Sequence, residues 1–224
     1  MPTDVPPSDR KGKLVHPEVT RYPALLAIVL VCAGVFVASE MTESRVSWEY
    51  GAKPAEVIEA WDTLVSGQLN VSVLGELGTL VAALFLHGGI DHILWNMVFF
   101  WLFGTLTAQL LGQWPAFVCF FVCGVCGNIL QVALNPDSMR PIIGASGSVC
   151  GFEGIYLALA LRWTLDYADV WPLGRPVAPM QLCIFALVGV GGDVYFQISG
   201  DEAIADGGHL GGFGSGFLIA RVVA

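Results

Sequence analysis

Long apolar blocks separated by short polar stretches dominate this chain. Six blocks approach the roughly 20 residues that a helix needs to cross a bilayer. They cover residues 23–39, 92–111, 115–134, 146–163, 180–198 and 208–224. The pattern predicts an all-α membrane protein, a six-transmembrane-helix bundle that forms one domain over residues 22–224. The polar, proline-rich residues 1–21 are expected to be a cytoplasmic tail.

The longest polar interval, residues 40–86, is expected to form an outer loop between the first two spans. Within it, residues 54–65 place apolar side chains at helical spacing. An amphipathic helix at the membrane interface fits this spacing. A small folded cap that packs on itself fits it equally well.

Composition and charge restrict the class of protein. Hydrophobic residues make up 55% of the chain and charged residues 13%, which excludes an ordinary soluble domain. The net charge of −9 argues against a nucleic-acid partner. The lipid bilayer is the expected surrounding, and we expect an integral, multi-pass membrane protein.

The distribution of basic residues predicts the orientation. If the amino terminus is cytoplasmic, six crossings leave most basic residues inside, as the positive-inside rule requires. These are Arg10, Lys11, Lys13, Arg21, Arg162, Arg175 and Arg221, whereas Arg45, Lys53 and Arg140 lie outside. The second, fourth and sixth spans then begin at the outer face.

Polar motifs occur at the beginnings of those same three spans. They are the group of His87, His92 and Asn96, the serine Ser146 between Gly144 and Gly147, and His209 among glycines. A serine hydroxyl needs a base within hydrogen-bond reach before it can act as a nucleophile. A histidine within a span indicates a functional site, because burying it unpaired is costly.

Spacing separates the histidines of the second span. His92 and Asn96 are four residues apart and share a helix face. As hydrogen-bond donors they suit the negative charge of a tetrahedral intermediate, or they simply bridge neighbouring spans. Asp91 is expected to cap this helix, and His87 to lie in the loop before it.

Glycines repeat every fourth residue in two spans, as Gly147 and Gly151 in the fourth and Gly208, Gly212 and Gly216 in the sixth. Such ridges of small residues let two helix backbones approach closely. We therefore expect the fourth and sixth spans to pack together and to bring His209 toward Ser146.

These motifs together resemble those of the rhomboid intramembrane serine proteases. The matching patterns are His-x4-His-x3-Asn, Gly-x-Ser-Gly and His-x2-Gly-x3-Gly, in this order over the second to sixth spans. The resemblance implies a bundle of rhomboid type, with Ser146 as nucleophile and His209 as general base. It implies an oxyanion hole made by His92, Asn96 and the Ser146 backbone N–H, with His87 in a structural role.

The resemblance also implies a substrate class and a location. The expected substrates are transmembrane segments of membrane proteins, cut near their outer end. We expect a bacterial inner membrane protein with its active site facing outside, and neither a metal nor an organic cofactor. Two alternatives are a non-catalytic rhomboid-like protein that binds membrane clients and a small transporter or metal channel that uses the three outer histidines.

Several residues do not follow from the resemblance. Cys150 stands one turn after Ser146, where the family usually has an aromatic side chain against the catalytic histidine. Glu153 is expected to be neutral and hydrogen-bonded inside the bundle, or to be a structural contact only. Asp193 is expected to face water, and Asp206 to cap the last helix or to orient His209.

Overall fold

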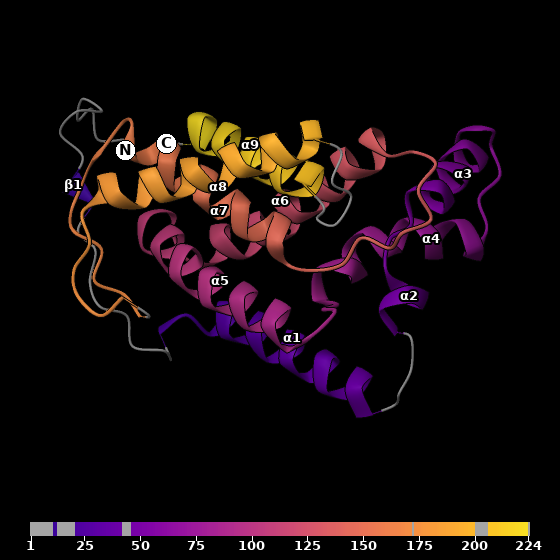
Figure 1. Ribbon diagram of the computed structural model, residues 1–224, viewed down its shortest axis with the longest axis horizontal. Helices are drawn as coiled ribbons and strands as arrows, with labels where there is room; N and C mark the ends of the chain where they lie inside the picture. The colour runs from indigo at the N-terminus through magenta and orange to yellow at the C-terminus, as the bar shows by residue number, and fades with distance from the viewer. Residues whose placement is uncertain (1–10, 13–20, 42–45, 172, 200–205, 224) are drawn as a thin grey trace.

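The computed structural model describes residues 11–12, 21–41, 46–171, 173–199 and 206–223. It is a helical bundle with one very short two-stranded sheet (Figure 1). A helix occupies each of the six predicted spans. They are α1 (Pro23–Met41), α5 (Ile90–Leu111), α6 (Gln113–Leu134), α7 (Ser146–Ala160), α8 (Pro179–Ser199) and α9 (Asp206–Val223).

Three of these helices, α1, α5 and α6, are long and apolar enough to cross a membrane. This makes the chain an integral membrane protein. By contrast, α7 has 15 residues, which corresponds to a length of only about 22 Å. Six crossings and a cytoplasmic amino terminus therefore remain predictions.

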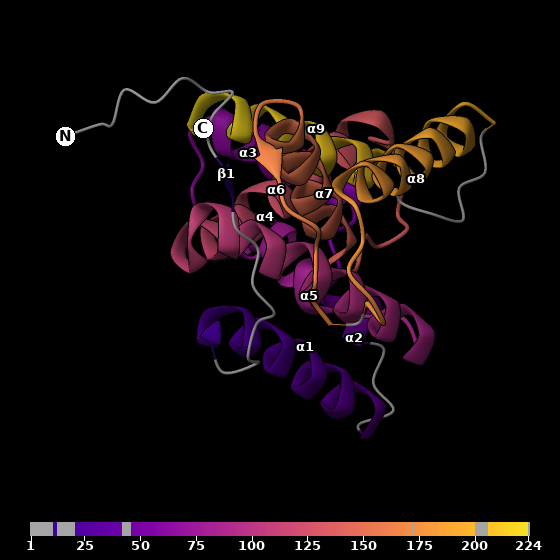
Figure 2. The ribbon, with the colours of Figure 1, turned by 90° about the vertical axis from the view of Figure 1, so that its left-hand side faces the viewer.

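Helix α7 lies at the centre of the bundle. It packs against α5, α6, α8 and α9, and all but the first, fifth and last of its 15 residues are buried. A helix that is apolar on every side is typical of such a position. Figures 1 and 2 both show α1, α5, α7 and α9 following one another across the molecule.

Aromatic side chains fill the space between α5, α6 and α7. Phe100 contacts Phe120 edge-on, with ring centroids 5.5 Å apart, and contacts Phe152 at 5.7 Å. Phe103 contacts Tyr156 at 6.0 Å. All five side chains are fully buried or nearly so. This core fixes the position of α7 and therefore that of its first residue, Ser146.

The predicted outer loop is a folded cap rather than an irregular segment. It contains α2 (Val46–Tyr50), α3 (Pro54–Val65), α4 (Val71–Ala82) and the 3₁₀ turn η3 (Ala83–Phe85). Helix α4 begins where the Asn70 side chain accepts a 3.0 Å hydrogen bond from the Val73 N–H. The helix expected at residues 54–65 is confirmed, whereas α4 was not expected.

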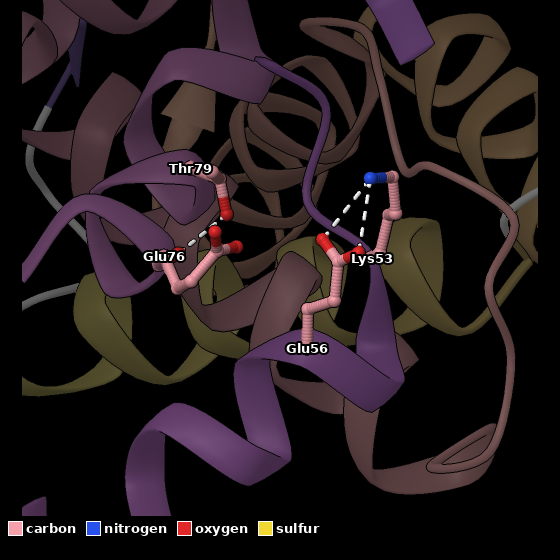
Figure 3. Close-up of polar contacts among 4 residues, drawn as sticks. All are labelled: Lys53, Glu56, Glu76 and Thr79. Carbon is pink, nitrogen blue, oxygen red and sulfur yellow. Dashed lines mark hydrogen bonds and ion pairs between the residues drawn. The ribbon is translucent and has the colours of Figure 1, made fainter. Parts of the chain in front are cut away.

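The cap has a small hydrophobic cluster of its own. The cluster joins α3 and α4 to α6, and its members are Ala52, Val57, Leu80, Ala83, Val132 and Ile142. Polar contacts lie outside it. Lys53 pairs with Glu56 at 3.1 Å, and the Thr79 hydroxyl bonds the Glu76 carbonyl (Figure 3). This packing favours the folded-cap interpretation of the sequence, although Trp61 and Val65 on α3 remain exposed.

The two strands lie at the opposite end of the bundle from the cap (Figure 1). Strand β1 (Lys11–Gly12) pairs in parallel with β2 (Thr164–Leu165). The rest of the predicted tail before residue 21 lies outside the described residues. The pairing places Lys11 beside the segment that follows α7. The cytoplasmic location of both stays a prediction.

Candidate active site

Ser146 is the first residue of α7, and it is half-buried. Its backbone N–H belongs to the first turn, whose N–H groups have no partner within the helix. The aligned peptide dipoles also make this end of α7 favourable for negative charge. Ser146 therefore combines a hydroxyl with a backbone donor at a site suited to an anion.

Gly144 controls the approach to Ser146. Its φ of +115° lies in the left-handed region, which favours glycine. A Cβ added there would lie 2.7 Å from His92 Nε2 and 3.7 Å from Ser146 Oγ. The Gly144 N–H also donates a 2.8 Å hydrogen bond to the Ala83 carbonyl. The absence of a side chain thus lets the His92 ring reach the start of α7.

Cap residues support the segment that leads to Ser146. Ala52 and Ile142 form an antiparallel bridge, with N–H···O distances of 3.2 and 2.8 Å. The Ala55 N–H donates a 3.1 Å hydrogen bond to the Ser138 carbonyl. The cap therefore fixes the entry to α7, although the bonded residues Ala52 and Ala55 lie more than 80 residues before their partners in the sequence.

His92 is oriented by the loop before α5. The Gly88 N–H donates to His92 Nδ1 at 3.2 Å. Because Nδ1 accepts, a neutral ring carries its proton on Nε2, the nitrogen that faces Gly144. Asn96 is buried and donates from Nδ2 to the His92 carbonyl at 2.9 Å. His92 thus presents an N–H donor beside Ser146, and Asn96 keeps a second amide hydrogen for another acceptor.

The start of α5 differs from the prediction in one respect. Gly89 is the residue that precedes the helix, and Asp91 lies exposed in its first turn. The prediction that Asp91 caps α5 was therefore wrong, because the helix begins one residue before it. His87 lies in the loop, as expected.

His87 is a buried neighbour of His92. The two rings meet edge-on, with centroids 5.2 Å apart. Burial lowers the pKa of His87 from 6.5 to about 4, and the adjacent His92 adds to this effect, which the Phe85 backbone offsets only in part. His87 is therefore neutral near pH 7, and its ring packs against that of His92.

Interlocking glycines join α7 to α9. A Cβ added at Gly212 would lie 3.1 Å from Gly147 Cα and would overlap the Gly147 carbonyl oxygen. A Cβ at Gly216 would overlap the Gly151 carbonyl in the same way. The two backbones are thus in direct contact, as the spacing predicted. His209, in the first turn of α9, is held at the level of the first turns of α7.

Helix α6 also positions the beginning of α9. Gln131 Oε1 accepts a 3.1 Å hydrogen bond from the Gly208 N–H, the residue before His209. This contact supplies a partner for an N–H in the first turn of α9. Asp206 begins α9 and is buried there. A carboxylate at this place is favourable for the helix dipole.

His209 makes its side-chain contact with Asp193 of α8. His209 Nδ1 lies 2.9 Å from Asp193 Oδ1, and the two side chains are only 19% and 15% exposed. Because an ionised carboxylate accepts only, a neutral His209 ring that bonds it carries its proton on Nδ1 and leaves Nε2 as an acceptor. The contact corrects the expectation that Asp193 simply faces water. No hydrogen bond joins His209 to Ser146 Oγ in the described part of the chain.

Cys150 and Glu153 lie on α7 below Ser146. The Sγ of Cys150, a carboxylate oxygen of Asp193 and a ring nitrogen of His209 all lie within 4.8 Å of one another. Glu153 is buried and close enough to both Cys150 and Asp193 to interact electrostatically. Glu153 therefore lies inside the bundle, as predicted; whether it is neutral stays a prediction.

Asp193 is the residue that sequence reasoning failed to assign. A carboxylate inside the apolar block of residues 180–198 is unusual and was noticed. Its partner depends on how α8 is rotated against α9, which no spacing rule fixes. The carboxylate in an apolar block was therefore the signal in the sequence, whereas only the structure identifies His209 as its partner.

Together these features define a helical membrane protein whose polar side chains converge where α5, α7 and α9 begin. Comparison with known proteins agrees with this class. Residues 74–224 match the family model of the Rhomboid domain. The chain belongs to the rhomboid family.

Individual relatives are similar over parts of their length. The chain is 31% identical over 118 residues to YdcA of Bacillus subtilis, which carries a rhomboid protease name, covering 52% of this chain and 58% of that protein. It is 27% identical to RHOMBOID-like protein 5 of Arabidopsis thaliana, covering 65% and 45%. It is also 27% identical to Rhomboid protease GluP of Bacillus subtilis, covering 66% and 26%. The chain thus spans well under two thirds of these relatives.

Proposed function

We propose that the chain is an intramembrane serine endopeptidase that cleaves transmembrane segments of membrane proteins. One observation carries the proposal: contact between the glycine ridges of α7 and α9 brings the first turns of both helices together, with Ser146 on one and His209 on the other. Membership of the rhomboid family and relatives with protease names support it.

The proposed mechanism begins with Ser146 as nucleophile. His209 Nε2 takes the hydroxyl proton as Ser146 Oγ attacks the scissile carbonyl, and an acyl-enzyme forms when the protonated ring returns that proton to the leaving amine. Water then repeats the sequence and releases the carboxyl product. Asp193 holds Nδ1 and keeps the ring in the tautomer that leaves Nε2 able to accept. The mechanism requires Ser146 Oγ and Nε2 to come within hydrogen-bond reach, a contact that is often longer without substrate.

The developing oxyanion has three proposed donors. They are the Ser146 backbone N–H, the Nε2–H of His92 and the free amide hydrogen of Asn96. Loss of one such donor costs about 10²–10³ in rate in soluble enzymes. His87 and the glycines Gly144, Gly147, Gly151, Gly212 and Gly216 have supporting roles in this proposal.

The membrane arrangement is part of the same proposal. Residues 22–224 form a six-span domain after a cytoplasmic tail, and the ends of α5, α7 and α9 that carry the site face outside. A bacterial inner membrane fits the distribution of basic residues. Substrates enter from the bilayer and are cut near their outer end.

Cleavage in proteoliposomes tests the proposal. The purified protein is reconstituted with a single-span protein tagged at both ends, and fragments are followed by mass spectrometry. Wild type is expected to release two fragments, whereas Ser146→Ala and His209→Ala release none. Ser215→Ala is the matched control, because the Ser215 hydroxyl bonds the Gly212 carbonyl of its own helix. Binding of the substrate without cleavage by wild type would instead favour a non-catalytic rhomboid-like protein that binds membrane clients.

A further inference from the structure

Three helices contribute one metal-ligating side chain each to a cluster beside His209. Cys150 comes from α7, Asp193 from α8 and His209 from α9. One ligand atom of each lies within 4.8 Å of the other two, and all three residues are partly buried. The sequence predicted no metal site, because these residues are far apart along the chain. The packing of α8 and α9 against α7 brings them together.

We propose that Cys150, Asp193 and His209 form a binding site for a thiophilic divalent cation such as Zn²⁺, and that the bound ion switches the protease off. Zn²⁺ is bound by thiolate, imidazole and carboxylate ligands, at about 2.0–2.3 Å. A thiolate in the set disfavours Mg²⁺ and Ca²⁺, which take oxygen ligands. Tetrahedral coordination needs the ligand atoms roughly 3.5 Å apart, so a side-chain adjustment of about 1 Å closes the site.

The identity of the residue at position 150 makes the site possible. An aromatic side chain there would place a ring against His209, whereas cysteine offers a ligand atom. Among the cysteines of the chain, Cys32, Cys119, Cys123 and Cys183 are buried in the bundle, while Cys126 and Cys150 are half-buried. Only Cys150 belongs to a group of three such ligands among the described residues.

The switch follows from the tautomer of His209. In the metal-free state Asp193 holds the proton on Nδ1, so Nε2 is free to accept the serine proton. When the cation binds Nδ1, that proton moves to Nε2, because a neutral imidazole carries one proton. The Cys150 thiol loses its own proton to solvent as it becomes a ligand. A ring with Nε2–H is a donor, and it no longer serves as the base for Ser146.

The inhibitory effect rests on the proposed function, but binding of the ion does not. Binding is therefore measured in the Ser146→Ala protein, which needs no activity, with Co²⁺ as a spectroscopic probe. We expect visible bands of tetrahedral cobalt together with an ultraviolet thiolate-to-cobalt charge-transfer band. Cys150→Ser should abolish the charge-transfer band and Asp193→Asn should weaken binding. Cys126→Ser is the matched control and should leave the spectrum unchanged.

Inhibition is measured separately, as the rate at which a fluorophosphonate probe labels the protein with an otherwise native sequence. Zn²⁺ should block labelling, EDTA should restore it, and Cys150→Ser should need at least about tenfold more Zn²⁺ for the same block. A cobalt spectrum without a thiolate band, or one that Cys150→Ser leaves unchanged, overturns the site. A thiolate band together with zinc-insensitive labelling overturns the switch. Cobalt binding in a protein that the probe never labels would contradict the proposed protease function while leaving the site in place.

Discussion

Replacing Gly212 by alanine tests the contact between α7 and α9. The added Cβ would lie well under 3.0 Å from the Gly147 carbonyl oxygen, a separation that real Cβ atoms essentially never show. The methyl group would meet backbone atoms of Gly147, which cannot move aside by a change of rotamer as a side chain can. The two helices must therefore separate where the second turn of α9 meets the first turn of α7.

The expected loss of activity follows from that displacement. The helices would part by about 1 Å, and a misplacement of this size can cost on the order of 10²-fold in rate. The assay is the second-order rate of fluorophosphonate labelling, measured beside the thermal unfolding of each variant in detergent. We expect labelling to fall by about 10²-fold, accompanied by a lower unfolding temperature.

Gly214 provides the matched control on the same helix. A Cβ there meets no atom within 4 Å, and alanine is a better helix former than glycine by up to about 1 kcal/mol. Gly214→Ala should therefore label at the wild-type rate with equal or higher stability. If Gly212→Ala labels as fast as Gly214→Ala, close helix contact does not position the site, and the reasoning fails.

Three further predictions concern other contacts. Asp193→Asn should lower kcat on the order of 10²-fold or more, with a smaller effect on KM and little loss of stability, because the His209 ring is then no longer held in one tautomer. Asp91→Asn, in an exposed turn, is the control. Equal kcat values for the two variants would refute the role of Asp193 in orienting His209. The pKa of His87 is about 4 in the folded protein and 6.5 in the unfolded chain. The free energy of unfolding should therefore fall as the pH is lowered from 6.5 to 4, by up to about 1.4 kcal/mol per pH unit, because the unfolded state binds the proton first. Denaturant titrations of wild type and His87→Gln should diverge only in that window, and parallel curves would contradict it. Asn70→Ala should destabilise the folded cap by about 1 kcal/mol, because α4 loses the side-chain hydrogen bond at its N-terminus. An unchanged unfolding midpoint would count against that contact.

The sequence predicted the helices because membrane spans carry their signal in local composition. The positions of α1, α5, α6, α7, α8 and α9 agree with the six apolar blocks within a few residues. The glycine repeat predicted the α7–α9 contact for the same reason, since small residues repeated every four positions in a helix allow a second helix to pack closely. Local patterns were sufficient for both.

Elements whose stability comes from distant contacts were not predictable in this way. Helix α4 has few polar residues and lies in an interval between spans, and it is held by contacts with α3 and α6. The pairing of Asp193 with His209 depends on the rotation of α8 about its axis. The Asp91 prediction failed because the chain enters α5 through Gly88 and Gly89, so the helix begins at Ile90 and already contains Asp91.

Identification of the modified residue tests the central claim most directly. The reconstituted protein is treated with a fluorophosphonate, and the adduct is located by mass spectrometry of its peptides. The account predicts a single adduct on Ser146 in wild type, none in Ser146→Ala, and a labelling rate reduced by about 10²-fold or more in His209→Ala. An adduct on another serine, or equal labelling of wild type and His209→Ala, would contradict the claim that Ser146 and His209 act together.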